Sequence, residues 1–266
     1  MTGKVTFVGA GPGAADLLTV RAVRAIAAAD VVVWADSLIH PDVLQYARAD
    51  AEVIDSSPLA LEDVLAVYGR AAAEGLAVAR LHSGDPALWS AVQEQWDRCR
   101  ELGLDAEIVP GVSAFSAVAA LAGRELTIPE VAQSVVLTRL GGGKTPMPAA
   151  ETVEAFARHG TTMAVYLSAA RAGRLERELL AGGYPPETPV VVAYRATWPD
   201  ELLERCNVGT LAATVRARKL WKHTLFLIGP ALATGGTRSH LYHPGHFHGF
   251  RRADPAARAD LRGDGR

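Results

Sequence analysis

The first half of the chain alternates short apolar runs with stretches in which apolar residues recur every three or four positions. The runs have the length of strands buried on both faces of a sheet, and the stretches have the spacing of amphipathic helices. This alternation predicts a mostly parallel sheet with helices on its faces. We expect strands at 5–8, 31–34, 52–54, 76–82 and 105–109, and helices at 17–28, 41–48, 57–68 and 88–102.

The second half begins after Pro110-Gly111, which breaks the pattern. Ser113 is placed to cap a helix that ends at Gly123. Turn residues are densest at 112–124, so we predict two α/β domains, at 1–115 and 116–250, followed by a disordered tail at 251–266. Within the second domain we expect strands at 135–140, 163–167, 190–194 and 224–228, and helices near 151–158, 170–181 and 209–217.

The segment Leu81-His82-Ser83-Gly84-Asp85-Pro86 puts a carboxylate and a proline where a predicted strand ends. In open α/β sheets, small ligands bind beyond the carboxyl ends of the strands. Gly84 permits close approach of a ligand because glycine has no Cβ. The segment predicts a ligand-binding turn, and a plain strand-to-helix turn is the alternative from this motif alone.

A second candidate is the loop Gly9-Ala10-Gly11-Pro12-Gly13-Ala14, which fits the relaxed dinucleotide pattern G-x-G-x-x-A. Asp36 lies near the position expected for a residue that binds the ribose. Against this interpretation, Pro12 removes a backbone donor from the loop, and Asp16 puts a negative charge where phosphates would lie. A nicotinamide or flavin dehydrogenase stays open at this point.

Composition and charge narrow the class of protein. The chain has 27 Lys and Arg against 29 Asp and Glu, and a formal net charge of −2 does not suit a general nucleic-acid binder. No apolar run reaches the roughly 20 residues of a membrane span, and the N-terminus has no signal-peptide pattern. Two cysteines give no disulfide framework, so we expect a cytoplasmic protein. We expect no functional metal, although His240, His243, His246 and His248 cluster near the C-terminus.

Six segments stand out when they are taken together in their order and spacing. Three are Val8-Gly9-Ala10-Gly11-Pro12-Gly13 with Asp16-Leu17-Leu18-Thr19, Arg80-Leu81-His82-Ser83-Gly84-Asp85-Pro86, and Val109-Pro110-Gly111-Val112-Ser113-Ala114. They resemble the tetrapyrrole methyltransferases, which use S-adenosylmethionine. Residues 125–131, 194–201 and 239–242 are similar to the members that methylate carbon 11 of precorrin-4 in cobalamin biosynthesis.

This resemblance implies two α/β domains of the tetrapyrrole methylase type with the cofactor in the interdomain cleft, and a homodimer. It also implies that the glycine-rich loop faces the tetrapyrrole. Asp85 is assigned an orienting or electrostatic role, because methyl transfer from a sulfonium needs alignment more than a strong acid or base. The residues implied to bind S-adenosylmethionine, and its product S-adenosylhomocysteine, are Pro12, Ser83, Gly84, Asp85, Leu88, Ser113, Ala114, Leu167, Ala196 and Thr224.

The implied substrate, precorrin-4, carries many carboxylates, which the paired N–H groups of arginine bind well. The residues expected at the substrate are Gly11, Asp16, Arg80, Arg124, Arg139 and Arg195, with Lys144 as a further candidate. Arg195 is the first choice because it adjoins the implied cofactor turn. His82 is expected to be a structural histidine rather than a base. A cobalt-bearing substrate, a different ring carbon and a binding protein without turnover remain as alternatives.

Overall fold

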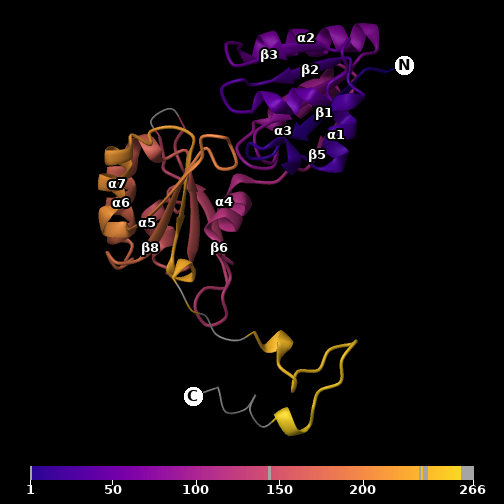
Figure 1. Cartoon of the computed structure of the whole chain (residues 1–266). Coiled ribbons are helices and arrows are strands. Elements are labelled where there is room, and N and C mark those ends of the chain that lie inside the picture. Colours follow the sequence, from indigo (N-terminus) through magenta and orange to yellow (C-terminus); the bar gives the residue numbers. More distant parts are fainter. Residues whose placement is uncertain (1, 143–144, 234, 236–238, 259–266) are drawn as a thin grey trace. The chain divides into compact units, whose positions relative to one another are not determined.

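The computed structural model describes residues 2–142, 145–233, 235 and 239–258 (Figure 1). These residues form two five-stranded sheets with helices against them. The predicted α/β fold is therefore confirmed. None of the described helices has both the length and the apolar character needed to cross a membrane.

The first sheet is parallel, and its inner strands are buried on both faces. Its elements are β1 (Lys4–Gly9), α1 (Val20–Ala27), β2 (Val31–Trp34), β3 (Glu52–Asp55), α2 (Leu61–Glu74), β4 (Ala77–His82), α3 (Val92–Glu101) and β5 (Asp105–Val109). The strand order is β3-β2-β4-β1-β5. Helix α1 packs Ala22 and Ile26 into the core on one face. Helices α2 and α3 pack Tyr68 and Cys99 into the core on the other face.

The neighbouring strands β1 and β4 send the chain in opposite directions. From β1 the chain runs to β2, on the far side of β4, whereas from β4 it runs to β5, on the far side of β1. Such a divergence opens a crevice at the carboxyl ends of the two strands, where ligands of open α/β sheets bind. Both motifs that the sequence singles out, residues 9–14 and 81–86, lie at these strand ends.

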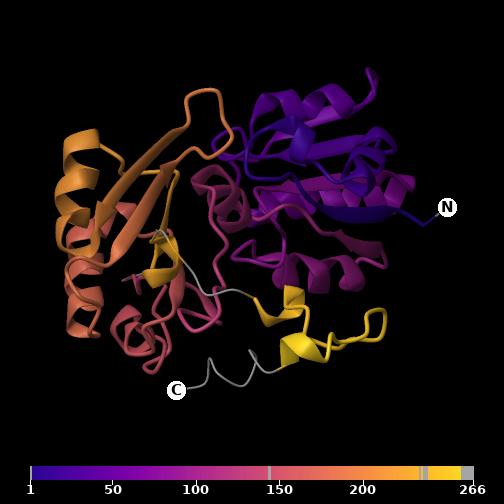
Figure 2. The same cartoon turned by 60° about the horizontal axis from the view of Figure 1, so that its bottom comes forward.

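The second sheet mixes parallel and antiparallel pairs. Its strands are β6 (Val135–Arg139), β7 (Thr162–Tyr166), β8 (Pro189–Tyr194), β9 (Leu202–Asn207) and β10 (Thr224–Ile228), in the order β6-β7-β10-β8-β9. Strands β6 and β7 are parallel, and β10 is antiparallel to β7. Helices α5 (Val153–Ala157), α6 (Ala172–Ala181) and α7 (Leu211–Arg218) lie along one face of this sheet (Figures 1 and 2).

The chain divides into two compact units, and each unit is built from more than one segment of the chain. The first unit holds the residues up to Gly123 together with 192–204 and 218–225, and the second holds 124–191, 205–217 and the described residues from 226 onward. Helix α4 (Ala114–Ala122) thus belongs to the first unit, whereas the predicted boundary after residue 115 cuts through it. Residues 259–266 of the predicted tail lie outside the described residues.

Several predicted boundaries need correction. Helix α3 begins at Val92 and not at 88, because Trp89 and Ala91 adopt left-handed backbone conformations with φ of 51° and 49°. Trp89 is 43% exposed and does not join the buried face of the helix. The predicted helix at 41–48 is a 3₁₀ turn, Pro41–Tyr46, and strand β9 was not predicted because Glu204 and Arg205 interrupt its apolar residues. Gly123 does end α4, with a φ of 63°, but the Ser113 side chain makes no capping hydrogen bond.

Candidate functional site

Three loops of the first unit meet at the carboxyl ends of β1, β4 and β5. Gly11 and Gly84 exchange backbone hydrogen bonds, with N···O distances of 3.2 Å from Gly11 to Gly84 and 2.7 Å in the reverse direction. Gly84 has a φ of 69°, a left-handed conformation that glycine adopts without strain. The glycine-rich loop is thereby fixed to the turn that follows β4.

The third loop crosses the other two so closely that side chains have no room. A Cβ on Gly9 would lie 2.5 Å from the backbone nitrogen of Gly111. A Cβ on Gly111 would lie 2.2 Å from the carbonyl oxygen of Gly84. Both distances are shorter than any van der Waals contact, so glycine is required at 9 and 111 for packing within the protein. This requirement explains part of the glycine pattern without any dinucleotide.

Asp85 holds two of these loops together. Its Oδ2 accepts a hydrogen bond from the Gly111 N–H at 2.9 Å, and its Oδ1 accepts one from the Ala87 N–H at 2.8 Å. Both carboxylate oxygens therefore have backbone partners, which suits an orienting group and does not suit a nucleophile. The first unit gathers around these strand ends most of the predicted ligand residues: Gly11, Pro12, Ser83, Gly84, Asp85, Leu88, Ser113 and Ala114.

The loop between β8 and β9 docks on the glycine-rich loop. The Trp198 Nε1–H donates to the Pro12 carbonyl at 3.1 Å, and the Thr197 hydroxyl accepts from the Ala14 N–H at 2.9 Å. A Cβ on Gly13 would lie 2.3 Å from Cδ1 of Trp198, so this glycine also serves packing. Two polar groups of the loop are thus taken by the protein itself, which counts against a pyrophosphate site there.

Arg195 and Ala196 lie at the start of this docked loop. The Arg195 guanidinium pairs with Asp200 at 2.8 Å and lies over the Trp198 ring, 4.6 Å from its centroid. The Arg195 N–H donates to the carbonyl of His223 at 2.9 Å, next to Thr224. Burial, and then the charge of Arg195, lower the pKa of His223. Ala196 and Thr224 are both buried in the first unit.

In the second unit, Leu167 and Arg139 follow neighbouring parallel strands. Leu167 comes directly after β7, is 69% exposed and has a φ of 51°. Arg139, the last residue of β6, is in register with Tyr166. A left-handed non-glycine residue costs free energy, so the surroundings must hold it in place, and such residues cluster at functional sites. The ligand role of Leu167 stays a prediction.

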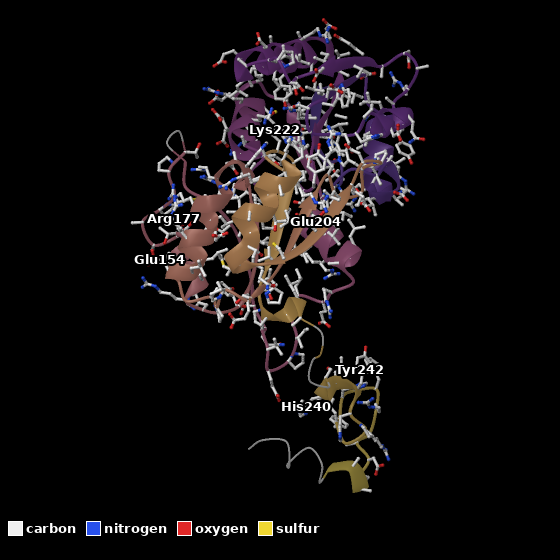
Figure 3. All side chains as sticks on the ribbon, turned by 60° about the vertical axis from the view of Figure 1, so that its left-hand side comes forward. Glu154, Arg177, Glu204, Lys222, His240 and Tyr242 are labelled. Carbon is white, nitrogen blue, oxygen red and sulfur yellow. The ribbon has the colours of Figure 1, made fainter. Side chains whose placement is uncertain are left out.

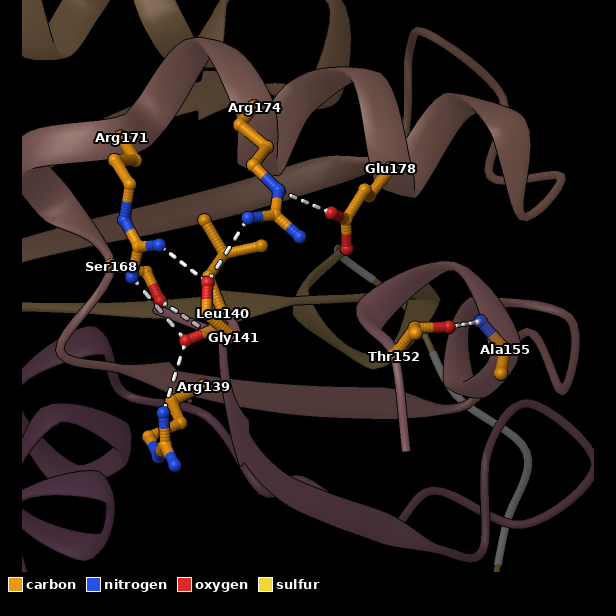
Figure 4. Close-up of polar contacts among 9 residues, drawn as sticks. All are labelled: Arg139, Leu140, Gly141, Thr152, Ala155, Ser168, Arg171, Arg174 and Glu178. Atoms are coloured by element: carbon orange, nitrogen blue, oxygen red, sulfur yellow. Dashed lines mark hydrogen bonds and ion pairs between the residues drawn. The ribbon is translucent and has the colours of Figure 1, made fainter. Parts of the chain in front are cut away.

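Three arginines surround the carbonyl groups that follow β6 (Figure 4). Arg139 donates to the Leu140 carbonyl at 3.3 Å, and Arg174 donates to that of Gly141 at 3.0 Å. Arg171 also donates to the Gly141 carbonyl. Among the residues drawn in Figure 4, Glu178 is the carboxylate partner, 2.6 Å from Arg174.

Arg139 was predicted from the sequence, whereas Arg171 and Arg174 were not. The signal that could have indicated them is their spacing of three residues, which puts both on one side of the helical segment after β7.

Arg80 and His82 lie on the face of β4 towards α2 and α3, where Arg80 is partly buried and His82 is buried. The Arg80 guanidinium donates to Ser56 Oγ at 2.7 Å, its Nε has no hydrogen-bond partner among the described residues, and burial lowers its pKa. His82 is 7% exposed and contacts the Phe7 ring. Burial, with the Arg80 charge second, lowers the pKa of His82 to about 3. A neutral, buried His82 agrees with the structural role expected for it.

Arg124 belongs to the second unit, where it lines a cavity of about 620 Å³ near the start of β8 and the end of β9. The predicted candidate Lys144 lies outside the described residues.

The histidine-rich segment near the C-terminus contains a 3₁₀ turn, His240–Tyr242 (Figure 3). Among residues 2–142, 145–233, 235 and 239–258, no group of three or more His, Cys, Asp or Glu is arranged to hold a metal ion.

The comparisons with known proteins agree on one family. The family model described as "Tetrapyrrole (Corrin/Porphyrin) Methylases" matches residues 4–212. A precorrin-4 C(11)-methyltransferase from Sinorhizobium sp is 43% identical over 248 residues, covering 93% of this chain and 98% of that protein. A cobalt-precorrin-4 C(11)-methyltransferase from Methanocaldococcus jannaschii is 41% identical, covering 86% of this chain and 88% of its own length.

Solved structures agree with the sequence comparisons. A cobalt precorrin-4 methyltransferase matches with a TM-score of 0.83 and 40% identity, covering 86% of this chain and 96% of that one. A uroporphyrin-III C-methyl transferase from Thermus thermophilus, complexed with S-adenyl homocysteine, matches with a TM-score of 0.72 and 26% identity, covering 86% and 99% of the two chains. These matches overturn the dehydrogenase alternative that the glycine pattern alone left open.

Proposed function

Because the chain belongs to the tetrapyrrole methylases, we propose that it transfers a methyl group from S-adenosylmethionine to carbon 11 of precorrin-4 in cobalamin biosynthesis. The products are precorrin-5 and S-adenosylhomocysteine. The observation that carries this proposal is similarity along nearly the whole chain to C(11)-methyltransferases, at 43% identity over 93% of its length.

The residues at the strand ends fit a nucleoside-bearing sulfonium donor. Ser83 is exposed at these strand ends, next to Gly84. When bound, S-adenosylmethionine supplies a methyl group on a positively charged sulfur, which a nucleophilic ring carbon takes in line. We assign binding of this donor to the ten residues implied by the resemblance. Asp85 acts by fixing the loops after β4 and β5, because its two oxygens hold backbone N–H groups.

For the substrate's carboxylates, the arrangement after β6 favours Arg139 over the other predicted arginines. Arg139 and Arg171 donate to backbone carbonyls, which orient guanidinium groups but do not neutralise them. Arg174 donates to one of the same carbonyls and also pairs with Glu178. Arg195 pairs with Asp200, and the partly buried Arg80 donates to Ser56 Oγ. We therefore propose Arg139 and Arg171 as the principal carboxylate contacts, with Arg174 beside them and with Gly11 and Asp16 facing the macrocycle.

The second candidate function is the same methyl transfer to cobalt-precorrin-4 in place of metal-free precorrin-4. Relatives named for precorrin-4 and for cobalt-precorrin-4 resemble this chain almost equally, at 43% and 41% identity. We propose the metal-free substrate, a homodimer and a cytoplasmic location. A methyl-transfer assay with both substrates tests the first, and light scattering of the purified protein tests the second.

The decisive first experiment is isothermal titration with S-adenosylhomocysteine, with NAD and NADP in parallel. Micromolar binding of S-adenosylhomocysteine alone is expected. Binding of a nicotinamide nucleotide in its place would overturn the proposed cofactor and every site residue assigned to it.

A further inference from the structure

The loop between β8 and β9 carries two side chains with directed contacts to the glycine-rich loop, although neither has a role in the proposed reaction. Thr197 accepts the Ala14 N–H at 2.9 Å, and Trp198 donates to the Pro12 carbonyl at 3.1 Å. The Trp198 ring also meets the edge of the His40 ring, with centroids 4.9 Å apart. The two hydrogen bonds join segments more than 180 residues apart in sequence, and all three contacts lie within the first unit.

The same loop holds a strained turn. Arg195 and Thr197, on either side of Ala196, have φ values of 43° and 68°. A β-branched residue such as Thr197 adopts this conformation only when its surroundings fix it. Here the Thr197 N–H donates to Glu201 Oε2 at 2.8 Å, and the Trp198 N–H donates to the Arg195 carbonyl at 2.9 Å.

The two loops therefore set each other's position. Pro12 and Ala196 are both assigned to the methyl donor, and each adjoins a residue of the docking contact. Gly13 leaves no free space between the loops, because a Cβ there would lie 2.3 Å from Trp198 and 2.8 Å from Thr197 Oγ1. A shift of either loop would move both donor contacts.

From this geometry we infer that Thr197 and Trp198 are positioning residues for S-adenosylmethionine. They lock the Pro12 loop to the Ala196 turn, so that both are in place before the donor binds. The inference rests on the proposed function, because it takes Pro12 and Ala196 as donor contacts. Preorganisation of this kind raises affinity by removing the ordering cost of binding.

The test compares two substitutions of one residue. Thr197→Val keeps the shape and the β-branch but removes the acceptor for the Ala14 N–H, whereas Thr197→Ser keeps the acceptor. We expect Thr197→Val to weaken S-adenosylhomocysteine binding about tenfold and to raise KM for S-adenosylmethionine more than it lowers kcat, since one lost hydrogen bond is worth about that factor. Thr197→Ser should stay within about threefold of the wild type.

A control separates positioning from general stability. Thr152 caps α5 in the second unit, where its Oγ1 accepts the Ala155 N–H at 3.1 Å, so Thr152→Val removes a similar bond far along the chain from the loops. It should lower Tm but leave S-adenosylhomocysteine affinity unchanged. If Thr197→Val folds poorly, Trp198→Phe serves instead, because it keeps a ring beside Arg195 and His40 but lacks the Nε1–H donor.

The outcomes are distinct. Wild-type affinity in both Thr197→Val and Trp198→Phe, with a fall in Tm like that of Thr152→Val, would overturn the positioning role and leave the proposed function intact. No binding of S-adenosylhomocysteine by the wild-type chain would overturn the proposed function and this inference with it. Weakened binding in Thr197→Val, restored in Thr197→Ser, supports the inference.

Discussion

At the scale of single residues, Gly111 has no room for a side chain. Its missing Cβ would lie 2.2 Å from the Gly84 carbonyl oxygen and 2.8 Å from the Gly9 Cα, and all of these neighbours are backbone. We expect Gly111→Ala to lower the free energy of unfolding by about 1–3 kcal/mol, because three chain segments must move apart. Urea denaturation of the wild type and the variant measures this difference.

Gly69 provides the matched control for Gly111. It lies inside α2, and a Cβ there would meet nothing within 4 Å. Gly69→Ala should therefore stabilise the protein by up to about 1 kcal/mol, the ordinary gain for this change in a helix. Equal effects of the two substitutions would contradict the packing argument.

His82 gives a pH dependence with a defined sign. Its pKa is lowered from the usual value of 6.5 to about 3 by burial. Between these values the unfolded chain binds a proton that the folded chain does not, so stability falls as the pH falls below about 6.5. His82→Gln should reduce the slope of unfolding free energy against pH by up to about 1.4 kcal/mol per pH unit between pH 4 and 6. Parallel curves of unfolding free energy against pH for both proteins would rule out this contribution.

At the scale of elements, the start of α6 and the 3₁₀ turn before it supply Arg171 and Arg174 to the end of β6 (Figure 4). Arg171→Gln or Arg174→Gln should raise KM for the tetrapyrrole about tenfold, because each removes charged hydrogen bonds, with kcat little changed. Arg177→Gln, at an exposed position of the same helix, is the control (Figure 3). The same KM in all three variants and the wild type would show that Arg171 and Arg174 do not bind the substrate.

At the scale of the whole molecule, ligand binding at the donor site should raise the free energy of unfolding. S-adenosylhomocysteine at about 100 times its Kd is expected to add about 2.7 kcal/mol to the free energy of unfolding, because it binds the folded chain alone. A thermal melt should then show a higher Tm with this ligand and an unchanged Tm with NAD. A Tm that does not respond to S-adenosylhomocysteine would argue against the site.

The apolar runs predicted most strands, because strands buried on both faces must be apolar throughout. They did not predict β9, which lies at the edge of the second sheet and contains as many polar as apolar residues. The glycine-rich loop was found from its pattern, but the reason for its glycines was not. Gly111 leaves no room for a Cβ on Gly9, and Trp198 leaves none for a Cβ on Gly13. No local sequence rule links residues so far apart. Arg80 was named from its closeness to a motif in sequence; its side chain is partly buried and donates to Ser56, and its role at the substrate stays a prediction.

The discontinuous first unit has a bearing on how the chain is made. A ribosome releases residues in order, and the glycine-rich loop emerges first, whereas Thr197 and Trp198 follow more than 180 residues later. Until then, the first sheet has all of its strands but its ligand loops lack their partner. A polypeptide released before that point carries an unfinished site. We therefore expect tight ligand binding only once translation has passed the loop between β8 and β9.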